Sequence, residues 1–310
     1  MPNIFQRAYK STLAVWERKD LSMWDYSPKV SLPIYGMYHI YCADGWESMV
    51  REQFGNLVSA GLLEATTKLY ISCIATKEED IVRLREIFDN DKIEIISISN
   101  DPGCFEYPAL DYMYEKSKHE DFLFYYFHTK GISYQTFDTK DKLFLAFRRK
   151  IVSWRRMMEY FIFDRWNVAV NTLLNGYETY GSYLFPPFVN RMYAGNFWWA
   201  RSDYFATLDR LSDETKRKNR FMAEEWLLTK VKKPFSAFDT VADLYFVNIP
   251  ETLYVEGKHS IVDAICFFVV YTFRKYQKKW LKCSYKKKCQ KRFQQLKTST
   301  CPSKGGGRVV

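Results

Sequence analysis

The chain has 310 residues, of which 47% are hydrophobic, 18% aromatic and 26% charged. This apolar share is typical of a packed globular protein and excludes a chain that stays disordered for lack of apolar residues. The sequence has no run of about 18 apolar residues, and residues 1–20 contain no continuous apolar stretch, so we expect neither a membrane-spanning helix nor a secretory signal.

The positive charge is concentrated at the C-terminus. From Ala264 onward the chain has 13 Lys and Arg residues and no Asp or Glu, a charge of +13 within a net charge of +10, which leaves −3 for the first 263 residues. An acidic body offers no basic face to phosphates, so we expect no specific nucleic-acid partner. The seven cysteines form no CxxC pair, which predicts reduced thiols in a cytosolic protein and no zinc site.

Strands and helices are expected to alternate in the first half of the chain. Strands are predicted at residues 34–42, 68–75, 92–99 and 121–127, with helices at 46–63, 78–88 and 107–118. This alternation predicts an α/β fold with a mostly parallel sheet, whose strand C-terminal ends form the ligand-binding edge. Neither GxGxxG nor GxxxxGK[ST] occurs, which disfavours a dinucleotide-binding fold and a P-loop ATPase.

The second half is expected to be less regular. Helices are predicted at residues 141–163, 165–174, 203–211 and 220–231, and strands at 177–185 and 195–200. Further short strands are expected near Phe246 and Leu253, where they would complete the sheet. We expect an N-terminal arm (residues 1–29), one folded unit (residues 30–258) and a basic C-terminal tail (residues 259–310).

Four consecutive polar or small residues follow the fourth predicted strand: His128, Thr129, Lys130 and Gly131. A ligand at this edge would meet an imidazole, a hydroxyl and an ammonium group together. Lys130 can neutralise a phosphate, and Gly131 lets backbone amides approach the same oxygens. An ordinary polar turn would account for the same four residues.

Seven segments, taken in order, carry a resemblance to a known family. They are residues 38–41 (YHIY), 53–62 (Q, L and SAGL), 106–110 (EYPAL), 127–131 (FHTKG), 154–155 (WR), 194–200 (AGNFWWA) and 223–226 (AEEW). The chain resembles GT-A-type glycosyltransferases of surface-polysaccharide gene clusters and large viruses, which are related in pattern to rhamnan-synthesis proteins. The resemblance covers about residues 35–257. It implies a GT-A-like, Rossmann-type sheet with flanking helices.

The resemblance also implies a reaction. A hexosyltransferase of this kind would move a sugar from a UDP-, GDP- or dTDP-sugar to a glycan, such as a lipid-linked precursor of lipopolysaccharide or capsule. Residues 128–131 would bind the donor phosphates, while Asp44, Asn100 and Asp101, which follow other strands, would lie beside the base and ribose. A noncatalytic subunit of the same fold that binds a nucleotide sugar or glycan is the alternative.

The departing diphosphate needs positive charge, from a divalent cation such as Mn²⁺ or Mg²⁺ or from basic side chains. The Asp-x-Asp sequence at residues 89–91 precedes a strand and is predicted to be a turn. Two alternatives remain for the charge. In the first, which we favour, Lys130 together with Arg155 or Arg148 takes the place of the metal. In the second, His128 and an acidic residue bind a metal ion. The acidic candidates are Asp44 and Asp138.

Glu224 is the candidate catalytic base, because an inverting transfer needs a carboxylate that takes the proton of the acceptor hydroxyl. A solvated helix start would also suit this residue. The segment that contains Gly195, Asn196, Trp198 and Trp199 is expected to bind the acceptor, with a tryptophan stacked on a sugar. Because neighbouring strand residues face opposite sides, one of the two tryptophans is expected in the core.

The tail combines an apolar stretch (residues 261–273) with a basic, aromatic one (residues 274–282). A helix with aromatic residues on one side and Lys on the other can lie in a membrane interface and bind anionic lipids. We therefore expect a peripheral protein on the cytoplasmic, inner face of a membrane. A disordered solubilising tail and a nonspecific nucleic-acid arm are the alternatives.

Overall fold

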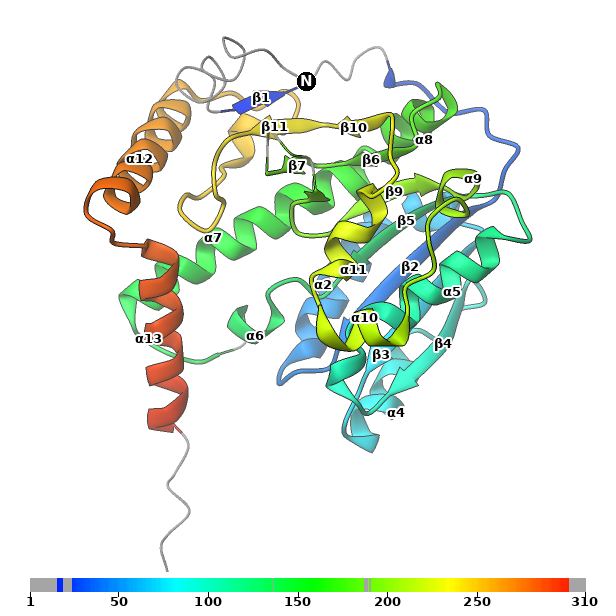
Figure 1. Cartoon of the computed structure of the whole chain (residues 1–310), viewed down its shortest axis with the longest axis horizontal. Helices are drawn as coiled ribbons and strands as arrows, with labels where there is room; N and C mark the ends of the chain where they lie inside the picture. The colour runs from blue at the N-terminus through cyan, green and yellow to red at the C-terminus, as the bar shows by residue number, and fades with distance from the viewer. Residues whose placement is uncertain (1–15, 19–23, 136, 187–188, 190, 301–310) are drawn as a thin grey trace, which may run out of the picture.

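The computed structural model describes residues 16–18, 24–135, 137–186, 189 and 191–300. Its centre is a seven-stranded sheet in the order β10-β6-β9-β5-β2-β3-β4 (Figure 1). The strands are β2 (Ile34–Tyr41), β3 (Lys68–Ile74), β4 (Ile93–Ser99), β5 (Leu123–His128), β6 (Thr179–Gly181), β9 (Trp198–Arg201) and β10 (Pro234–Ser236). Only β9 runs antiparallel to its neighbours in this sheet. The predicted α/β class with a mostly parallel sheet is confirmed.

Helices cover both faces of the sheet, and each face has its own core. One core contains Tyr38 and Phe127 of the sheet, and the other contains Met37 and Tyr126. The first is covered by α2 (Trp46–Ser59), α3 (Leu62–Ala65), α4 (Glu78–Ile87), α7 (Lys142–Glu159), the π-helical turn η3 (Tyr160–Asp164) and α8 (Trp166–Leu174). The second is covered by α5 (Tyr107–Ser117), α9 (Ser202–Phe205), α11 (Met222–Glu225) and η4 (Trp226–Leu228). Burial on both faces explains why the central strands are almost continuously apolar.

The other described elements before residue 261 are short and lie outside the main sheet. They are β1 (Trp16–Arg18), η2 (Pro102–Cys104), α6 (Ile132–Gln135), β7 (Leu184–Phe185), β8 (Met192–Tyr193), α10 (Asp213–Lys218), β11 (Phe238–Thr240) and η5 (Glu251–Leu253). Strand β1 pairs antiparallel with β11, so part of the predicted N-terminal arm lies against the body. Residues 1–15 and 19–23 of that arm lie outside the described residues.

In the second half, two predicted strands are not observed and two predicted helices are shorter than expected. Phe246 lies in a turn and Leu253 in η5, whereas the strand that completes the sheet is β10. Pro234 opens β10, which is a position where a strand tolerates proline, but proline and the short length hid the strand in the sequence. The helix expected at 203–211 is the single turn α9, and the helix expected at 220–231 is α11 followed by η4.

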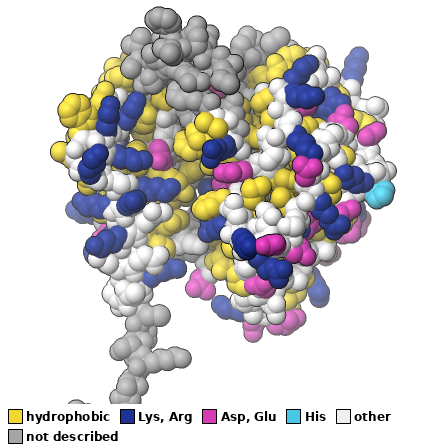
Figure 2. Space-filling view, in the orientation of Figure 1, with side chains coloured by type: hydrophobic (Ala, Val, Ile, Leu, Met, Phe, Trp, Pro, Cys, Tyr) yellow, Lys and Arg dark blue, Asp and Glu magenta, His cyan; other side chains and the backbone are white. Residues whose placement is uncertain are grey.

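The C-terminal tail forms two helices, α12 (Ile261–Trp280) and α13 (Tyr285–Thr300), through residue 300. Phe267 and Tyr271 of α12 are buried in the first core, and Phe293 of α13 is buried against α7. The tail is therefore a packed structure in residues 261–300. Figure 2 shows many Lys and Arg side chains on the side of the molecule where α12 and α13 lie. Within the described residues, no helix has both the length and the apolar character needed to cross a bilayer.

Candidate functional site

The site lies where the strand order reverses. From β2 the chain proceeds through β3 to β4 on one side, and β5 then pairs with the other edge of β2. The C-terminal ends of β2 and β5 therefore flank the point at which open α/β sheets bind ligands. A cavity of about 620 Å³ opens at this point. Its volume is in the range of small-molecule sites.

Segments far apart in the sequence line this cavity. His39 and Tyr41 come from the end of β2, residues 128–134 from β5 and α6, and Glu106 from the turn before α5. Arg220 and Glu224 come from the α11 region, and Lys286 and Gln290 come from α13. The structure thus brings together His128, Thr129, Lys130, Gly131 and Glu224 among the predicted site residues.

Local geometry explains two of the residues at the end of β5. Gly131 has a φ of 79°, and a Cβ atom there would lie 2.5 Å from Cγ2 of Ile151, so this position requires glycine. The Thr129 hydroxyl accepts a hydrogen bond of 3.0 Å from the backbone N–H of Tyr41. These constraints fix the turn that presents Lys130 to the cavity.

Three cations face the cavity: Lys130, Arg220 and Lys286. Each lies over an aromatic ring, with Lys130 Nζ 4.8 Å from the Trp154 ring centre and Lys286 Nζ 4.0 Å from that of Tyr245. The Arg220 guanidinium lies 5.2 Å from the ring of Phe221. None of the three forms an ion pair with any residue in the described part of the chain. Aromatic rings thus hold the cations in place while their charge stays available to an anion.

Glu106 is a carboxylate of the cavity that the sequence analysis left without a role. Its Oε2 accepts hydrogen bonds from Tyr126 Oη (2.8 Å) and from Asn196 Nδ2 (2.6 Å). Its other oxygen, Oε1, lies 3.6 Å from Nδ1 of His128. The two donors orient this carboxylate so that Oε1 faces the histidine.

His128 and His39 lie side by side, because they are register partners on β5 and β2. Burial lowers the pKa of each to about 4, and in His128 the nearby Lys130 adds to the effect. His128 is therefore neutral at pH 7. Its Nε2 lies 2.9 Å from the Gly195 carbonyl oxygen, which can only accept, so Nε2 carries the hydrogen. Nδ1 is then an acceptor that faces Glu106, and a hydroxyl donor or a cation would fit between the two groups.

The structure does not bring Asp44, Asn100 or Asp101 into this cavity. The Asp44 side chain is 98% exposed and lies 3.5 Å from Lys77 Nζ. Asp101 caps η2, where its carboxylate accepts a hydrogen bond of 2.8 Å from Gly103 N–H. All three residues are exposed and lie outside the cavity lining, and their contact with the base and ribose of a donor stays a prediction.

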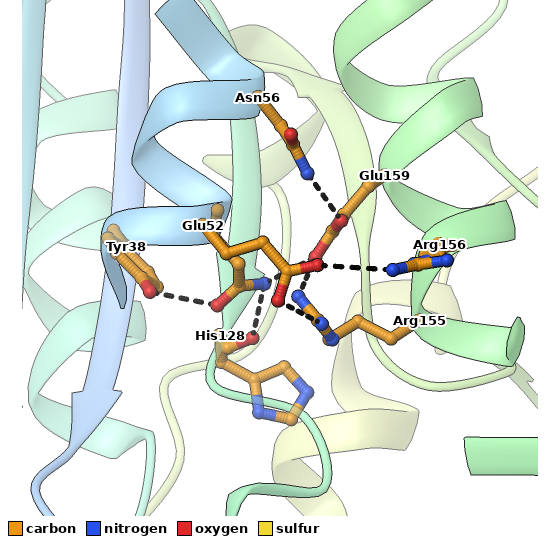
Figure 3. Close-up of polar contacts among 8 residues, drawn as sticks. Tyr38, Glu52, Asn56, His128, Arg155, Arg156 and Glu159 are labelled. Atoms are coloured by element: carbon orange, nitrogen blue, oxygen red, sulfur yellow. Dashed lines mark hydrogen bonds and ion pairs between the residues drawn. The ribbon is translucent and has the colours of Figure 1, made fainter. Parts of the chain in front are cut away.

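Arg155 was predicted to contact the donor phosphates, but it lies in a buried network outside the cavity, which Figure 3 shows. The side chain is 0% exposed and donates hydrogen bonds of 2.8 Å to Glu159 Oε1 and to Glu52 Oε2. Gln53 Nε2 donates to Glu159 at 2.9 Å and to the His128 carbonyl oxygen at 3.4 Å. Arg155 thus belongs to a buried network behind β5 that supports His128, and it does not reach a phosphate in the cavity.

Arg148 and Asp138, which were predicted to supply positive charge and to bind a metal, lie outside the cavity. Arg148 donates hydrogen bonds of 3.1 Å and 3.0 Å to the carbonyl oxygens of Gln135 and Phe137. Asp138 is exposed and does not line the cavity. Across the described ranges, no group of three or more His, Cys, Asp or Glu side chains is placed to hold a metal ion.

The predicted acceptor segment has a different role. Trp198 is 1% exposed and Trp199 is 0% exposed, because β9 lies between β5 and β6 with helices on both faces. Neither tryptophan can stack on a sugar. Asn196 is buried and bridges two groups: its Nδ2 donates to Glu106, and its Oδ1 accepts from Trp198 Nε1 at 2.8 Å. Together with Gly195, which contacts His128, it positions two cavity residues.

Comparison with protein-family models found no family that matches this chain, and comparison with curated proteins found no match. The site residues that the sequence analysis missed are His39, Glu106, Arg220, Lys286 and Gln290. Glu106 and His39 both lie in segments that carry the family resemblance (residues 106–110 and 38–41), so both carried a signal. Lys286 is one of three consecutive lysines, and nothing in the sequence separates it from the other two.

Proposed function

We propose that this protein is a GT-A-like glycosyltransferase that moves a sugar from a nucleotide-sugar donor to a glycan acceptor. The observation that carries the proposal is a cavity at the reversal point of the sheet, where Lys130 and two other cations face the carboxylate of Glu224 and form no ion pair within the described residues. A nucleoside diphosphate supplies the anion that such cations lack, and the carboxylate supplies a base.

The chemistry assigns one step to these groups. The acceptor hydroxyl oxygen forms a bond to the anomeric carbon as the bond from that carbon to the diphosphate oxygen breaks. Glu224 takes the hydroxyl proton, and the diphosphate leaves with the electron pair of the broken bond. Lys130 stabilises the charge that develops on the diphosphate. Glu106, held by Tyr126 and Asn196, accepts a hydrogen bond from an acceptor hydroxyl beside it and so orients that hydroxyl.

The test combines binding and turnover. Thermal unfolding of the full chain is measured with UDP-, GDP- and dTDP-sugars, in Mn²⁺, in Mg²⁺ and in EDTA, which also reports whether a divalent cation is needed. Glu224→Gln is expected to keep donor binding and to lower transfer by about 10²–10⁴-fold. Glu225→Gln is the matched control, because Glu225 is the next residue and does not line the cavity.

Each outcome has a clear meaning. If no nucleotide or nucleotide sugar raises the unfolding temperature of the wild type, the proposal is wrong. If donors bind but the wild type does not transfer or hydrolyse the sugar, a noncatalytic nucleotide-sugar or glycan-binding subunit explains the site better. Equal loss of activity in both Glu variants would remove Glu224 from its role as base.

We also propose that α12 holds the protein on the cytoplasmic face of an anionic membrane, near a lipid-linked glycan. Its outward side carries apolar residues that are between 40% and 81% exposed: Ile261, Val262, Ile265, Phe268, Val269, Val270, Phe273, Tyr276 and Trp280. Lys275, Lys278 and Lys279 lie on the same helix. An exposed apolar side with adjacent lysines suits the boundary between acyl chains and anionic headgroups.

Flotation with phosphatidylcholine vesicles, with and without phosphatidylglycerol, tests this proposal. The wild type is expected to float with the anionic vesicles, and Val262→Glu is expected to weaken that binding. Val58→Glu places the same change on an exposed valine of α2 and is the control. Absence of wild-type binding to anionic vesicles would overturn the membrane proposal and leave the glycosyltransferase proposal intact.

A further inference from the structure

Helix α13 is firmly attached to the body by one of its sides. Tyr285, Cys289 and Phe293 recur every four residues and are buried. The Phe293 ring stacks on that of Phe144, with centres 5.0 Å apart. These contacts fix which way the rest of the helix points.

Polar contacts at the two ends of this side reinforce the attachment. Lys150 Nζ donates a hydrogen bond of 3.2 Å to Tyr285 Oη, and Arg292 Nε donates one of 2.7 Å to Asp141 Oδ2. Asp141 is also the N-cap of α7, so α13 is attached to the start of a core helix. The position of α13 is therefore set along its length.

The residues that directly follow the buried Tyr285 and Cys289 face the cavity. Lys286 and Gln290 follow Tyr285 and Cys289 by one residue, and both line the cavity. Lys287 and Lys288 continue around the helix and are exposed. Of three consecutive lysines, the structure selects one for the cavity wall.

The surroundings of Lys286 leave its charge without a paired anion. In the described part of the chain it forms no ion pair, and its Nζ lies over the ring of Tyr245 at 4.0 Å. Burial lowers its pKa, and the positive charge of Lys130 across the cavity acts in the same direction, whereas Asp243 and Glu224 oppose them. When a multivalent anion lies between two such cations, its attraction to both outweighs their mutual repulsion across the cavity.

We propose that Lys286 and Gln290 of α13 bind the diphosphate of the donor opposite Lys130, so that the C-terminal helix is part of the substrate site. This inference rests on the proposed function and goes beyond it, because it makes the basic C-terminal region a binding element for a nucleoside diphosphate. Lys286 supplies a cation to the phosphate oxygens, and the Gln290 amide supplies a neutral donor one helical turn further on.

Isothermal titration calorimetry of the full chain with inorganic pyrophosphate and with UDP, GDP and dTDP tests the inference. Lys286→Ala is expected to weaken binding of the preferred diphosphate about tenfold or more, because a hydrogen bond to a charged group is lost. Lys286→Arg is expected to retain most of the affinity. Lys287→Ala, which removes an exposed charge from the same helix, is expected to bind like the wild type.

The outcomes separate the two proposals. If Lys130→Ala weakens binding while Lys286→Ala binds like the wild type, the inference about α13 is wrong and the proposed function stands. If Lys287→Ala weakens binding as much as Lys286→Ala, the effect is general charge attraction and the inference is again wrong. If the wild type binds neither pyrophosphate nor any of the diphosphates, both proposals fail. The thermal unfolding midpoint of each variant shows whether α13 remains folded.

Discussion

Replacement of Arg155 by Met tests the buried network behind the site. Arg155 is 0% exposed, and its change leaves the carboxylate of Glu159, which is 2% exposed, without its cation. Glu52 loses a partner too, but its side chain is 32% exposed and regains water. The main cost is therefore one uncompensated buried charge, which is worth about 3–5 kcal/mol of unfolding free energy.

This loss of unfolding free energy can be measured in two ways. For a chain of this size it lowers the unfolding temperature by roughly 5–8 °C. The double variant Arg155→Met, Glu159→Met removes both charges and is expected to recover much of the loss, because a buried pair replaced by apolar residues is often tolerated. Arg156→Met is the control, since Arg156 is 56% exposed and lies 3.8 Å from Glu52; its effect is expected to stay within about 0.5 kcal/mol.

The same reasoning gives a pH dependence. Burial raises the pKa of Glu159, and Arg155 opposes that rise. Without Arg155 the pKa rises further, so the folded chain holds a proton that the unfolded chain releases, and stability falls as pH rises above the ordinary pKa of 4.5. The difference between wild type and variant is therefore expected to be smaller at about pH 5 than at about pH 7. If urea unfolding at pH 7 gives the wild type and Arg155→Met the same midpoint, the stabilising role of the network is refuted. The same holds if the double variant recovers none of the lost stability.

Three more predictions concern the site and its supports. Gly131→Ala is expected to destabilise the fold by about 1–3 kcal/mol, because of the positive φ and the contact with Ile151; an unchanged thermal midpoint would contradict this. The pKa of His39, about 4 in the folded chain against an ordinary 6.5, means that stability is lost as pH falls through this window. His39→Gln is expected to reduce that loss in urea titrations at several pH values, and identical pH profiles would argue against it. Phe293→Ala is expected to speed amide hydrogen exchange across α13 while β5 stays protected; unchanged exchange in α13 would show that Phe293 does not hold this helix.

The first half of the fold was predictable because its signals are local. The strands expected at 34–42, 68–75, 92–99 and 121–127 are observed within two residues at each end. β2, β3 and β5 are buried on both faces, so their composition alone marks them, whereas β4 is an edge strand and is partly exposed. β10 has three residues and begins with Pro234, so its existence depends on pairing with β6, which a sequence does not display.

The site was predictable only where one short segment supplies it. Residues 128–131 end a strand and face the cavity as a unit, so their position along the chain was sufficient. Arg155 and Trp199 carry chemistry that suits a donor or an acceptor, but which side of a helix or strand they occupy depends on neighbours that are distant in sequence. Lys286 reaches the cavity only because Tyr285 and Phe293 attach α13 to the body.

The segment at residues 194–200 shows how a site can depend on residues that never touch a ligand. Because β9 is enclosed by β5 and β6, its strand residues cannot reach the cavity, and only the turn before it approaches the site. At that turn Asn196 holds the carboxylate of Glu106, and the Gly195 carbonyl fixes the hydrogen of His128 on Nε2. Trp198 in turn donates to Asn196 from within the core. The packing of β9 thus positions Glu106 through Asn196, and Gly195 in the same turn positions His128, so that these two groups face each other in the cavity.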